Sequence, residues 1–246
     1  MALLAPACAR APVRPTRSPD APQPPAPEAV AAGKIDYARY CESCHGLEGD
    51  GRGPSARQLD PRPRDFTRGL YEWRSTPSGT LPVDSDLART IRRGLYHRGM
   101  PRWNALSRGE VRHLVAYLEH FSPLFSTDPR GAPIVVPAET AESSGSLARG
   151  RRLYAIACAS CHGPKGRGDG PSARDLRDDW GRPDPPFDLT SGPPPCGGRD
   201  EDLFRVLMTG LNGTPMPSYA ASGLTSGQVW DLVHFVRSLR ESHPRG

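Results

Sequence analysis

Apolar residues recur at helical spacing in two segments, each of which closes one of two similar halves of the chain. In the first segment the apolar positions are Val111, Leu114, Val115, Tyr117, Leu118 and Phe121. In the second they are Val229, Leu232, Val233, Phe235, Val236 and Leu239. Spacings of three and four residues predict an amphipathic helix in each case. Shorter helices are predicted over 86–93 and 202–209, and we find no convincing alternation of the kind that indicates a β-strand.

The two halves are copies of one sequence repeat, which is the strongest organisational signal in the chain. Gly33-x-x-x-Tyr37-Ala-x-x-Cys41-x-x-Cys44-His45-Gly46 recurs 117 positions later as Gly150-x-x-x-Tyr154-Ala-x-x-Cys158-x-x-Cys161-His162-Gly163. Met100-Pro101 recurs as Met216-Pro217 at an offset of 116. Between these blocks, Asp65-Phe66-Thr67 matches Asp188-Leu189-Thr190, so the second copy carries six extra residues.

The repeat divides the chain into four parts. These are a leader with a Pro-rich tether over 1–30, a first domain over 31–122, a linker over 123–146 and a second domain over 147–246. Both domains are predicted to be mainly α with extensive Gly/Pro-rich loops, because the chain contains 29 prolines and 26 glycines. Only 36% of the residues are hydrophobic, so the cores are small and need a staple such as a disulfide or a metal.

Charge and hydropathy narrow the choice of partner. The formal net charge of +5 comes almost entirely from arginine, since Lys34 and Lys165 are the only lysines. The arginines are spread along the chain and form no nucleic-acid-binding motif, so we interpret them as solvated faces with a few cations near anionic cofactor groups. No apolar run reaches the ~20 residues of a membrane-spanning helix.

Cys8 and Cys196 lie outside the repeat. Small residues precede Cys8, as they do at the end of a bacterial lipoprotein signal, so a lipid anchor at Cys8 and an uninformative leader both stay open. Cys196 is interpreted as a free thiol, or as the disulfide partner of Cys8 if Cys8 carries no lipid.

The repeated Cys-x-x-Cys-His motif carries the chemistry. Residues three apart share a helix face, so two thiols can add to the two vinyl groups along one edge of a haem while the adjacent imidazole lies beneath the iron. A thioredoxin-like motif would lie near a βαβ pattern, and a zinc ribbon pairs its motifs about 15–20 residues apart; the chain shows neither feature. We therefore predict two covalently bound haem c groups, at Cys41, Cys44 and His45 and at Cys158, Cys161 and His162.

Met100 and Met216 are the predicted sixth ligands of the two irons. They share one repeat position, and the proline after each disfavours a helix at the methionine, which lets the thioether project from a loop. The alternative is a methionine that fills a gap in the core, and this is our interpretation of Met208. His97 competes with Met100, but its counterpart in the second copy is Gly213.

Over 31–122 and 147–240 the chain resembles class I cytochromes c, specifically tandem dihaem members of that family. The resemblance implies that Tyr117 and Phe235 pack against the first helix of their domains. It also implies that the carbonyls of Pro54 and Pro171 accept a hydrogen bond from the ligand imidazoles. Trp73 and Arg74 are expected either to contact a haem propionate or to pack as ordinary loop residues.

The resemblance implies an electron carrier rather than an enzyme, with redox proteins as donor and acceptor. An iron with His/Met ligation has no open position and passes one electron. The alternatives are a haem enzyme of the dihaem peroxidase type, which needs an open iron, and an electron-relay subunit of a larger oxidoreductase complex. Covalent haem attachment in this family occurs outside the bacterial cytoplasm, so we expect a periplasmic protein, although the export signal in this sequence is incomplete.

Overall fold

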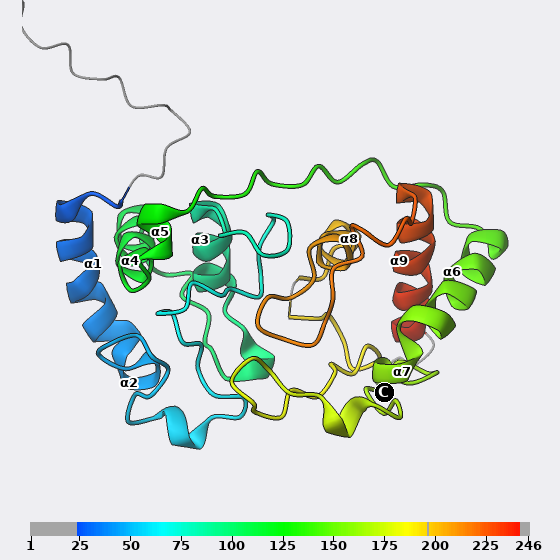
Figure 1. The fold of residues 1–246 in the computed structure, drawn as a ribbon, viewed down its shortest axis with the longest axis horizontal. Helices are drawn as coiled ribbons and strands as arrows, with labels where there is room; N and C mark the ends of the chain where they lie inside the picture. The colour runs from blue at the N-terminus through cyan, green and yellow to red at the C-terminus, as the bar shows by residue number, and fades with distance from the viewer. Residues whose placement is uncertain (1–23, 196, 242–246) are drawn as a thin grey trace, which may run out of the picture.

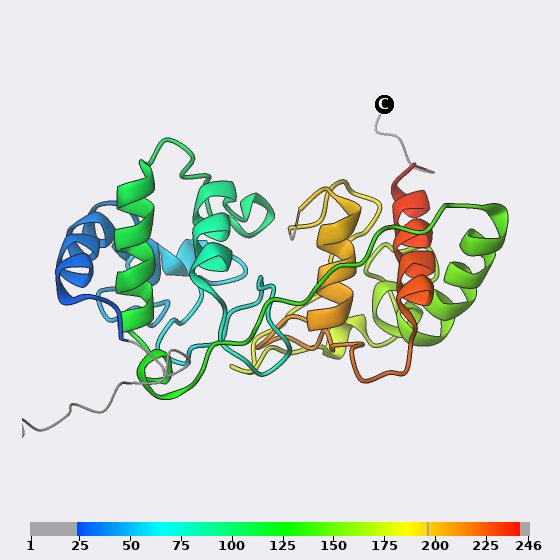
Figure 2. The same ribbon diagram turned by 90° about the horizontal axis from the view of Figure 1, so that it is seen from above.

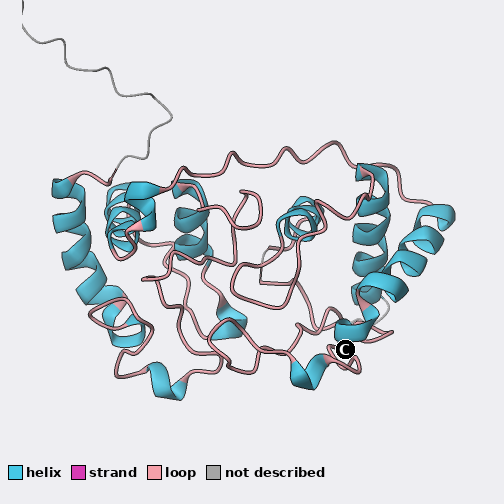
Figure 3. Ribbon diagram, viewed as in Figure 1, coloured by secondary structure: helices cyan, strands magenta, loops and turns pink. Residues whose placement is uncertain are grey.

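The computed structural model describes residues 24–195 and 197–241, and it is built from helices and long loops (Figure 3). Over these residues it contains three isolated β-bridges and no β-strand. The chain forms two lobes with the same succession of elements, which the extended linker joins along one side (Figure 1). The prediction of a mainly α fold with two tandem domains and extensive loops is confirmed.

The first lobe contains four helices and two 3-10 turns. Its elements are α1 (Pro27–Tyr40), α2 (Glu42–His45), η1 (Ala56–Gln58), α3 (Asp84–Arg93), η2 (Tyr96–Arg98) and α4 (Arg108–His120). The first helix begins inside the segment that its composition assigned to the tether. Pro27 occupies the first turn of α1, where a proline costs no hydrogen bond.

The second lobe repeats this order after the short helix α5 (Leu124–Thr127) and the linker. Its elements are α6 (Ser144–Ala157), α7 (Ala159–His162), η3 (Ala173–Asp175), α8 (Asp200–Thr209) and α9 (Ser226–Glu241). Seen from two directions, α1 and α6 lie at the far ends of the molecule while α3 and α8 lie towards its middle (Figures 1 and 2). No helix among the described residues is long and apolar enough to cross a membrane.

In each lobe the first helix crosses the last one at a glycine. The aromatic ring of Tyr37 lies 5.2 Å from that of Tyr117, and the ring of Tyr154 lies 5.1 Å from that of Phe235. The implied packing of Tyr117 and Phe235 is therefore confirmed. The first tyrosine of each pair also donates a hydrogen bond to the carbonyl that follows the Cys-x-x-Cys-His motif, at 2.7 Å for Tyr37 and 2.8 Å for Tyr154. This bond fixes the motif relative to the helix crossing.

Replacing Gly33 by alanine is expected to lower the free energy of unfolding by about 1–3 kcal/mol. A Cβ at Gly33 would lie 2.0 Å from the carbonyl oxygen of His113, so α1 and α4 would have to separate. Gly150 faces the carbonyl oxygen of Asp231 at the same 2.0 Å, and Gly150→Ala should have the same effect. Gly145→Ala is the control, because only a flexible arginine side chain and a serine hydroxyl approach that position, at 3.4 Å and 3.6 Å. Urea unfolding of the full chain provides the measurement, and equal stability of all three variants would contradict the expectation.

Buried arginine contacts join the two lobes. Arg74 is 2% exposed and donates to the carbonyls of Thr209 at 2.7 Å and Gly210 at 3.4 Å, both at the end of α8. Its Nε donates to the Pro77 carbonyl within its own loop. Of the two alternatives for Arg74, the propionate contact is therefore not supported, since its guanidinium is directed at backbone carbonyls of both lobes.

The beginning of the linker is tied to the first lobe by Arg130. This side chain forms ion pairs with Asp84 and, at 2.7 Å, with Glu119. Glu119 is 3% exposed, and its burial outweighs this pairing and raises its pKa to about 7. Folding therefore favours the protonated form of this carboxyl group.

The buried Glu119 predicts a pH dependence of stability. The folded-state pKa of about 7 lies above the ordinary value of 4.5. The contribution of protonated Glu119 to the free energy of unfolding is therefore fully present below about pH 4.5 and is lost as the pH rises through 7. The loss amounts to at most about 3 kcal/mol. Relative to wild type, Glu119→Gln should flatten the fall in unfolding free energy between pH 5 and pH 8, whereas replacement of the exposed Glu48 should not. Parallel pH profiles for wild type and Glu119→Gln would show that Arg130 keeps Glu119 ionised in the folded state.

Candidate functional site

Each Cys-x-x-Cys-His motif forms a single helical turn at the end of the first helix of its lobe. In the first lobe the backbone N–H groups of Cys44 and His45 both donate to the Cys41 carbonyl, at 3.1 Å and 2.9 Å. In the second lobe the corresponding distances to the Cys158 carbonyl are 3.1 Å and 2.8 Å. The two thiols and the imidazole of each motif are therefore brought to one side of a short helix, as the spacing predicts.

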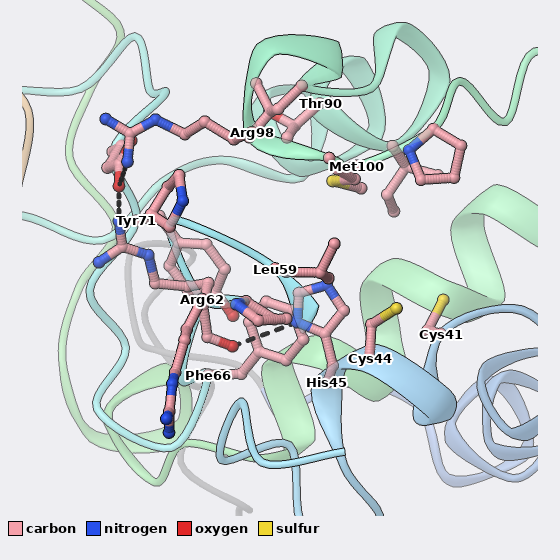
Figure 4. Close-up of a pocket in the computed structure, with 18 of the residues that line it drawn as sticks. Cys41, Cys44, His45, Leu59, Arg62, Phe66, Tyr71, Thr90, Arg98 and Met100 are labelled. Atoms are coloured by element: carbon pink, nitrogen blue, oxygen red, sulfur yellow. Dashed lines mark hydrogen bonds and ion pairs between the residues drawn. The ribbon is translucent and has the colours of Figure 1, made fainter. Parts of the chain in front are cut away.

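In the first lobe the motif opens onto a cavity of about 700 Å³. Figure 4 shows Cys41, Cys44 and His45 along one side and Met100 on the facing side, with its sulfur directed into the cavity. Apolar side chains supply much of the wall, among them Leu59, Phe66, Leu87, Ile91 and Leu118. The predicted site residues of the first copy thus line one space.

The imidazole of His45 is held by a backbone acceptor and an aromatic ring. Its Nδ1 donates to the carbonyl of Arg64 at 3.2 Å, and the ring stacks on Phe66 at 4.5 Å. Because a carbonyl can only accept, the Nδ1 of His45 carries the proton and Nε2 is free to bind a metal. Burial lowers the pKa of His45 to about 4, so the imidazole is neutral at physiological pH.

The second motif repeats this arrangement. Nδ1 of His162 donates to the carbonyl of Phe187 at 3.3 Å, and burial lowers the pKa of His162 as well. The expectation that Pro54 and Pro171 supply these carbonyls is wrong. The turns that contain those prolines instead fold back on the motif backbone, where Gly53 donates to the Cys44 carbonyl and Gly170 to the Cys161 carbonyl.

The acceptor carbonyls are placed by the repeated Asp-x-Thr turn. Asp65 Oδ1 accepts from the N–H and hydroxyl of Thr67 at 2.9 Å and 2.6 Å, and Asp188 does the same for Thr190. Arg64 and Phe187 immediately precede these turns. The recurrence of Asp-x-Thr in both copies is therefore the sequence signal from which the acceptors could have been located.

The two methionine loops are anchored in the same way. Leu95 donates to the Met100 carbonyl at 3.0 Å, and Leu211 donates to the Met216 carbonyl at 3.1 Å. Each loop starts at a glycine with positive φ, +64° at Gly94 and +63° at Gly210, where a side chain would be strained. The side chain of the competing ligand His97 lies outside the described part of the structure, as do Cys8 and Cys196.

An aromatic residue three positions after each methionine ties its loop to the last turn of the first helix. The Trp103 ring lies 5.2 Å from the ring of Tyr40. Its counterpart Tyr219 donates through its hydroxyl to the carbonyl of Ala157 at 2.8 Å. Tyr40 and Ala157 are the residues directly before the first cysteine of each motif. Each methionine loop is thus fixed relative to the thiols of its own lobe.

The thiols do not have the environment of a redox-active dithiol. Burial raises the pKa of Cys41 to about 12 and that of Cys158 to about 11, whereas thioredoxin-like motifs lower a cysteine pKa. The two motifs also lie at opposite ends of the molecule, on α2 and α7 (Figure 1). A shared zinc ribbon is therefore incompatible with their placement.

Unpartnered polar atoms in the cavity of the first lobe fit the acidic groups of a haem. Arg64 Nη1 and Trp73 Nε1 are buried and have no hydrogen-bond partner among the described residues, and both residues line the cavity. Figure 4 places Arg98 on the side away from the two cysteines. An apolar space with two thiols at one edge and guanidinium groups at the other suits a planar macrocycle with two carboxylates. The residues present therefore fit a haem attached at Cys41 and Cys44.

The comparisons with known proteins identify the family. The family model described as cytochrome c oxidase, cbb3-type, subunit III matches residues 28–118 and again residues 145–236. The chain belongs to this family and contains two copies of its domain. It is a dihaem c-type cytochrome, with two covalently attached haem c groups, and it is an electron-transfer protein rather than an enzyme.

Individual relatives agree with this assignment. The cytochrome bc1 complex cytochrome c subunits of Corynebacterium diphtheriae and Corynebacterium efficiens are 24% and 22% identical to the chain, over 88% of its length in both cases. The alignments cover 69% and 65% of those subunits, so the chain spans about two thirds of their length. A chain of the Kuenenia stuttgartiensis reducing HAO-like protein complex is 40% identical, with a TM-score of 0.82, over 85% of this chain and 95% of that one.

Proposed function

We propose that this cytochrome passes single electrons between redox proteins outside the cytoplasm. Cys41 and Cys44 would attach one haem, and His45 and Met100 would bind its iron. Cys158 and Cys161 would attach the other, and His162 and Met216 would bind its iron. The iron supplies the one-electron couple, and the chain holds it, keeps its ligand imidazole in one tautomer and excludes water.

The equivalence of the two methionine loops carries this proposal. Both have the same backbone anchors: Trp103 donates to the carbonyl of Ile91, and Tyr219 donates to that of Leu207, on the helix before each loop. In the first lobe, the methionine sulfur is directed into the cavity opposite the imidazole (Figure 4). A methionine ligand at each iron would favour a carrier over an enzyme of the dihaem peroxidase type, since the latter needs an exchangeable position at an iron.

A role as an electron-relay subunit of a larger complex is the second candidate. The two Corynebacterium relatives are subunits of a cytochrome bc1 complex, and the Kuenenia stuttgartiensis chain belongs to a reducing HAO-like complex. Because all three are parts of complexes, we infer that the donor or acceptor of this cytochrome is held in a stable assembly. An extracytoplasmic location suits covalent haem attachment, and a lipid at Cys8 would keep the protein at a membrane surface.

Haem analysis and spectroscopy of the periplasmically produced protein test the proposal. We expect two haems per chain that resist acid–acetone extraction, the weak long-wavelength charge-transfer band of thioether-ligated ferric haem, and no rapid cyanide binding. Extractable haem would contradict covalent attachment. Rapid cyanide binding at one iron would contradict two closed sites and would favour the peroxidase-type enzyme.

A further inference from the structure

The second copy of the repeat is longer than the first at one place, and the additional residues contact the first domain. Asp65 follows Arg57 by eight positions, whereas Asp188 follows Arg174 by fourteen. The middle of this longer segment, residues 178–184, lies beside η2 of the first lobe (Figure 1, yellow). We refer to residues 178–184 as the docking loop.

Internal hydrogen bonds define the shape of the docking loop. Asp178 Oδ1 accepts from the backbone N–H groups of Trp180 at 2.9 Å and Arg182 at 2.8 Å. Asp178 Oδ2 pairs with Arg182 Nε at 3.1 Å, and Gly181 between them has a φ of +73°. An aspartate that accepts from backbone groups two and four positions later forms a compact turn. The loop is thus a folded unit with Trp180 near its tip.

Trp180 lies against cationic groups of the first domain. The guanidinium groups of Arg64 and Arg68 lie 4.7 Å and 4.8 Å from its ring, and that of Arg182 lies 5.1 Å away. Such distances are those of cation–π contacts. The indole N–H of Trp180 also donates to Asp65 Oδ2 at 3.4 Å. One indole therefore holds two arginines of the other domain in place.

A second set of contacts holds the two ends of the docking loop. Arg98 Nη2 lies 3.3 Å from Asp184 Oδ1, and the same guanidinium reaches Glu72 at 3.5 Å. Arg68 donates to the carbonyl of Asp179 at 3.2 Å. The loop is therefore attached to the first domain near both of its ends as well as through Trp180.

These contacts converge on the site of the first domain. Arg64 supplies the carbonyl that accepts from His45 Nδ1, and its guanidinium forms an ion pair with Glu72 and stacks on Trp180. The docking loop also contributes four residues to the lining of the first cavity: Asp178, Arg182, Pro183 and Asp184. The wall of the first haem cavity is thus completed by the second domain.

We propose that the docking loop is a positioning element of the first haem site, a role that rests on the haem attachment proposed above. The loop holds Arg64, whose backbone orients His45, and it covers the edge of the cavity away from the cysteines. Access of water favours the ferric haem, which carries the additional positive charge. The two loop carboxylates that line the cavity, Asp178 and Asp184, are each paired with an arginine, Arg182 and Arg98, so the main effect of the loop is to exclude water. The loop therefore raises the reduction potential of the first haem and slows the entry of external ligands.

Spectroelectrochemical titration of Trp180→Ala in the holoprotein tests this role. The two haems are assigned with Met100→His and Met216→His, each of which changes the potential of its own haem. We expect the potential of the first haem to fall, that of the second to stay unchanged, and cyanide to bind several-fold faster at the first. Trp180→Phe, which keeps an aromatic face for the arginines, should restore most of the difference.

Arg177→Ala is the matched control, because Arg177 is exposed beside the loop and, among the described residues, its guanidinium donates only to the carbonyls of Arg174 and Leu176. Asp184→Asn cuts the pair with Arg98 but also removes a carboxylate from the cavity lining, so its readout is ligand entry and not the potential. Cyanide should bind faster at the first haem only, by a smaller factor than in Trp180→Ala, and this variant decides the matter if Trp180→Ala does not fold. Two attached haems with unchanged cyanide binding rates in these variants, or equal changes at both haems, would overturn this inference alone. A wild-type protein without covalent haem would instead refute the proposed function.

Discussion

A chain in which Cys158 and Cys161 are both replaced by alanine should retain one haem instead of two and lose the folded structure of its second domain. Among the described residues between α7 and α8, η3 is the only helical element, so long loops make up most of this stretch. The buried cluster of this domain is formed mainly by α6, α8 and α9, with Tyr154, Phe204 and Trp230 as the largest members. The loops between these helices have no comparable core of their own. We infer that the porphyrin supplies the apolar centre on which these loops fold.

Haem content, limited proteolysis and far-UV circular dichroism provide the measurements. Protease should remove the second domain of the double variant and leave a haem-containing fragment of the first. Cys196→Ser is the matched control, because it removes a thiol outside the motifs and should leave two haems. A protease-resistant second domain without haem would show that α6, α8 and α9 fold without the cofactor.

The chemistry of the site could be predicted from the sequence because it depends on side chains that recur in both copies of the repeat. Cys-x-x-Cys-His and Met-Pro return at offsets of 117 and 116, and a helical turn brings the three motif residues together without help from the rest of the fold. The crossing of the first and last helices could be predicted for the same reason. Gly33 and Gly150 recur opposite Tyr117 and Phe235, and a close approach of two helices requires a glycine at that point.

Contacts made by backbone groups leave no such signal in the contacting residues themselves, and the two imidazole acceptors are marked only indirectly, by the recurring Asp-x-Thr turn that follows each of them. The carbonyls of Arg64 and Phe187 accept from the two ligand imidazoles, yet the two side chains have nothing in common, and every residue has a carbonyl. Proline is favoured for this role only by the resemblance to class I cytochromes c. The hydrogen-bond partners of Arg74 cannot be predicted from the sequence for a related reason, since they are backbone carbonyls, of Thr209 and Gly210, that lie about 135 positions away.

The tether illustrates how composition can mislead at a boundary. The Pro-rich stretch over 9–30 suggests an irregular chain, but α1 already begins at Pro27. The residues that follow, Glu-Ala-Val-Ala-Ala, include good helix formers. A proline is compatible with the first turn, so the same residue that ends a helix elsewhere begins one here.

Met100→Ala should open one iron and leave the other closed. The variant is expected to bind one cyanide per chain, to lose about half of the long-wavelength charge-transfer band, and to show a lower potential at one haem. Methionine ligation raises the potential of a haem, so its loss should lower that potential by at least about 60 mV, a tenfold change in the one-electron equilibrium. Water or an added ligand would then occupy the position towards which the Met100 sulfur is directed (Figure 4).

Two further methionines make this experiment decisive. Met216→Ala should give the same changes at the other haem, because its loop has the same anchors on Leu211 and Leu207. Met208→Leu is the control, since Met208 lies within α8 and packs against the core of the second domain, and it should preserve both bands and both potentials. If Met100→Ala keeps the full band and still binds no cyanide, the sixth ligand of the first haem is another residue. His97, three positions earlier in the sequence, would then be the candidate in place of Met100, and the two haems would differ in ligation as well as in surroundings.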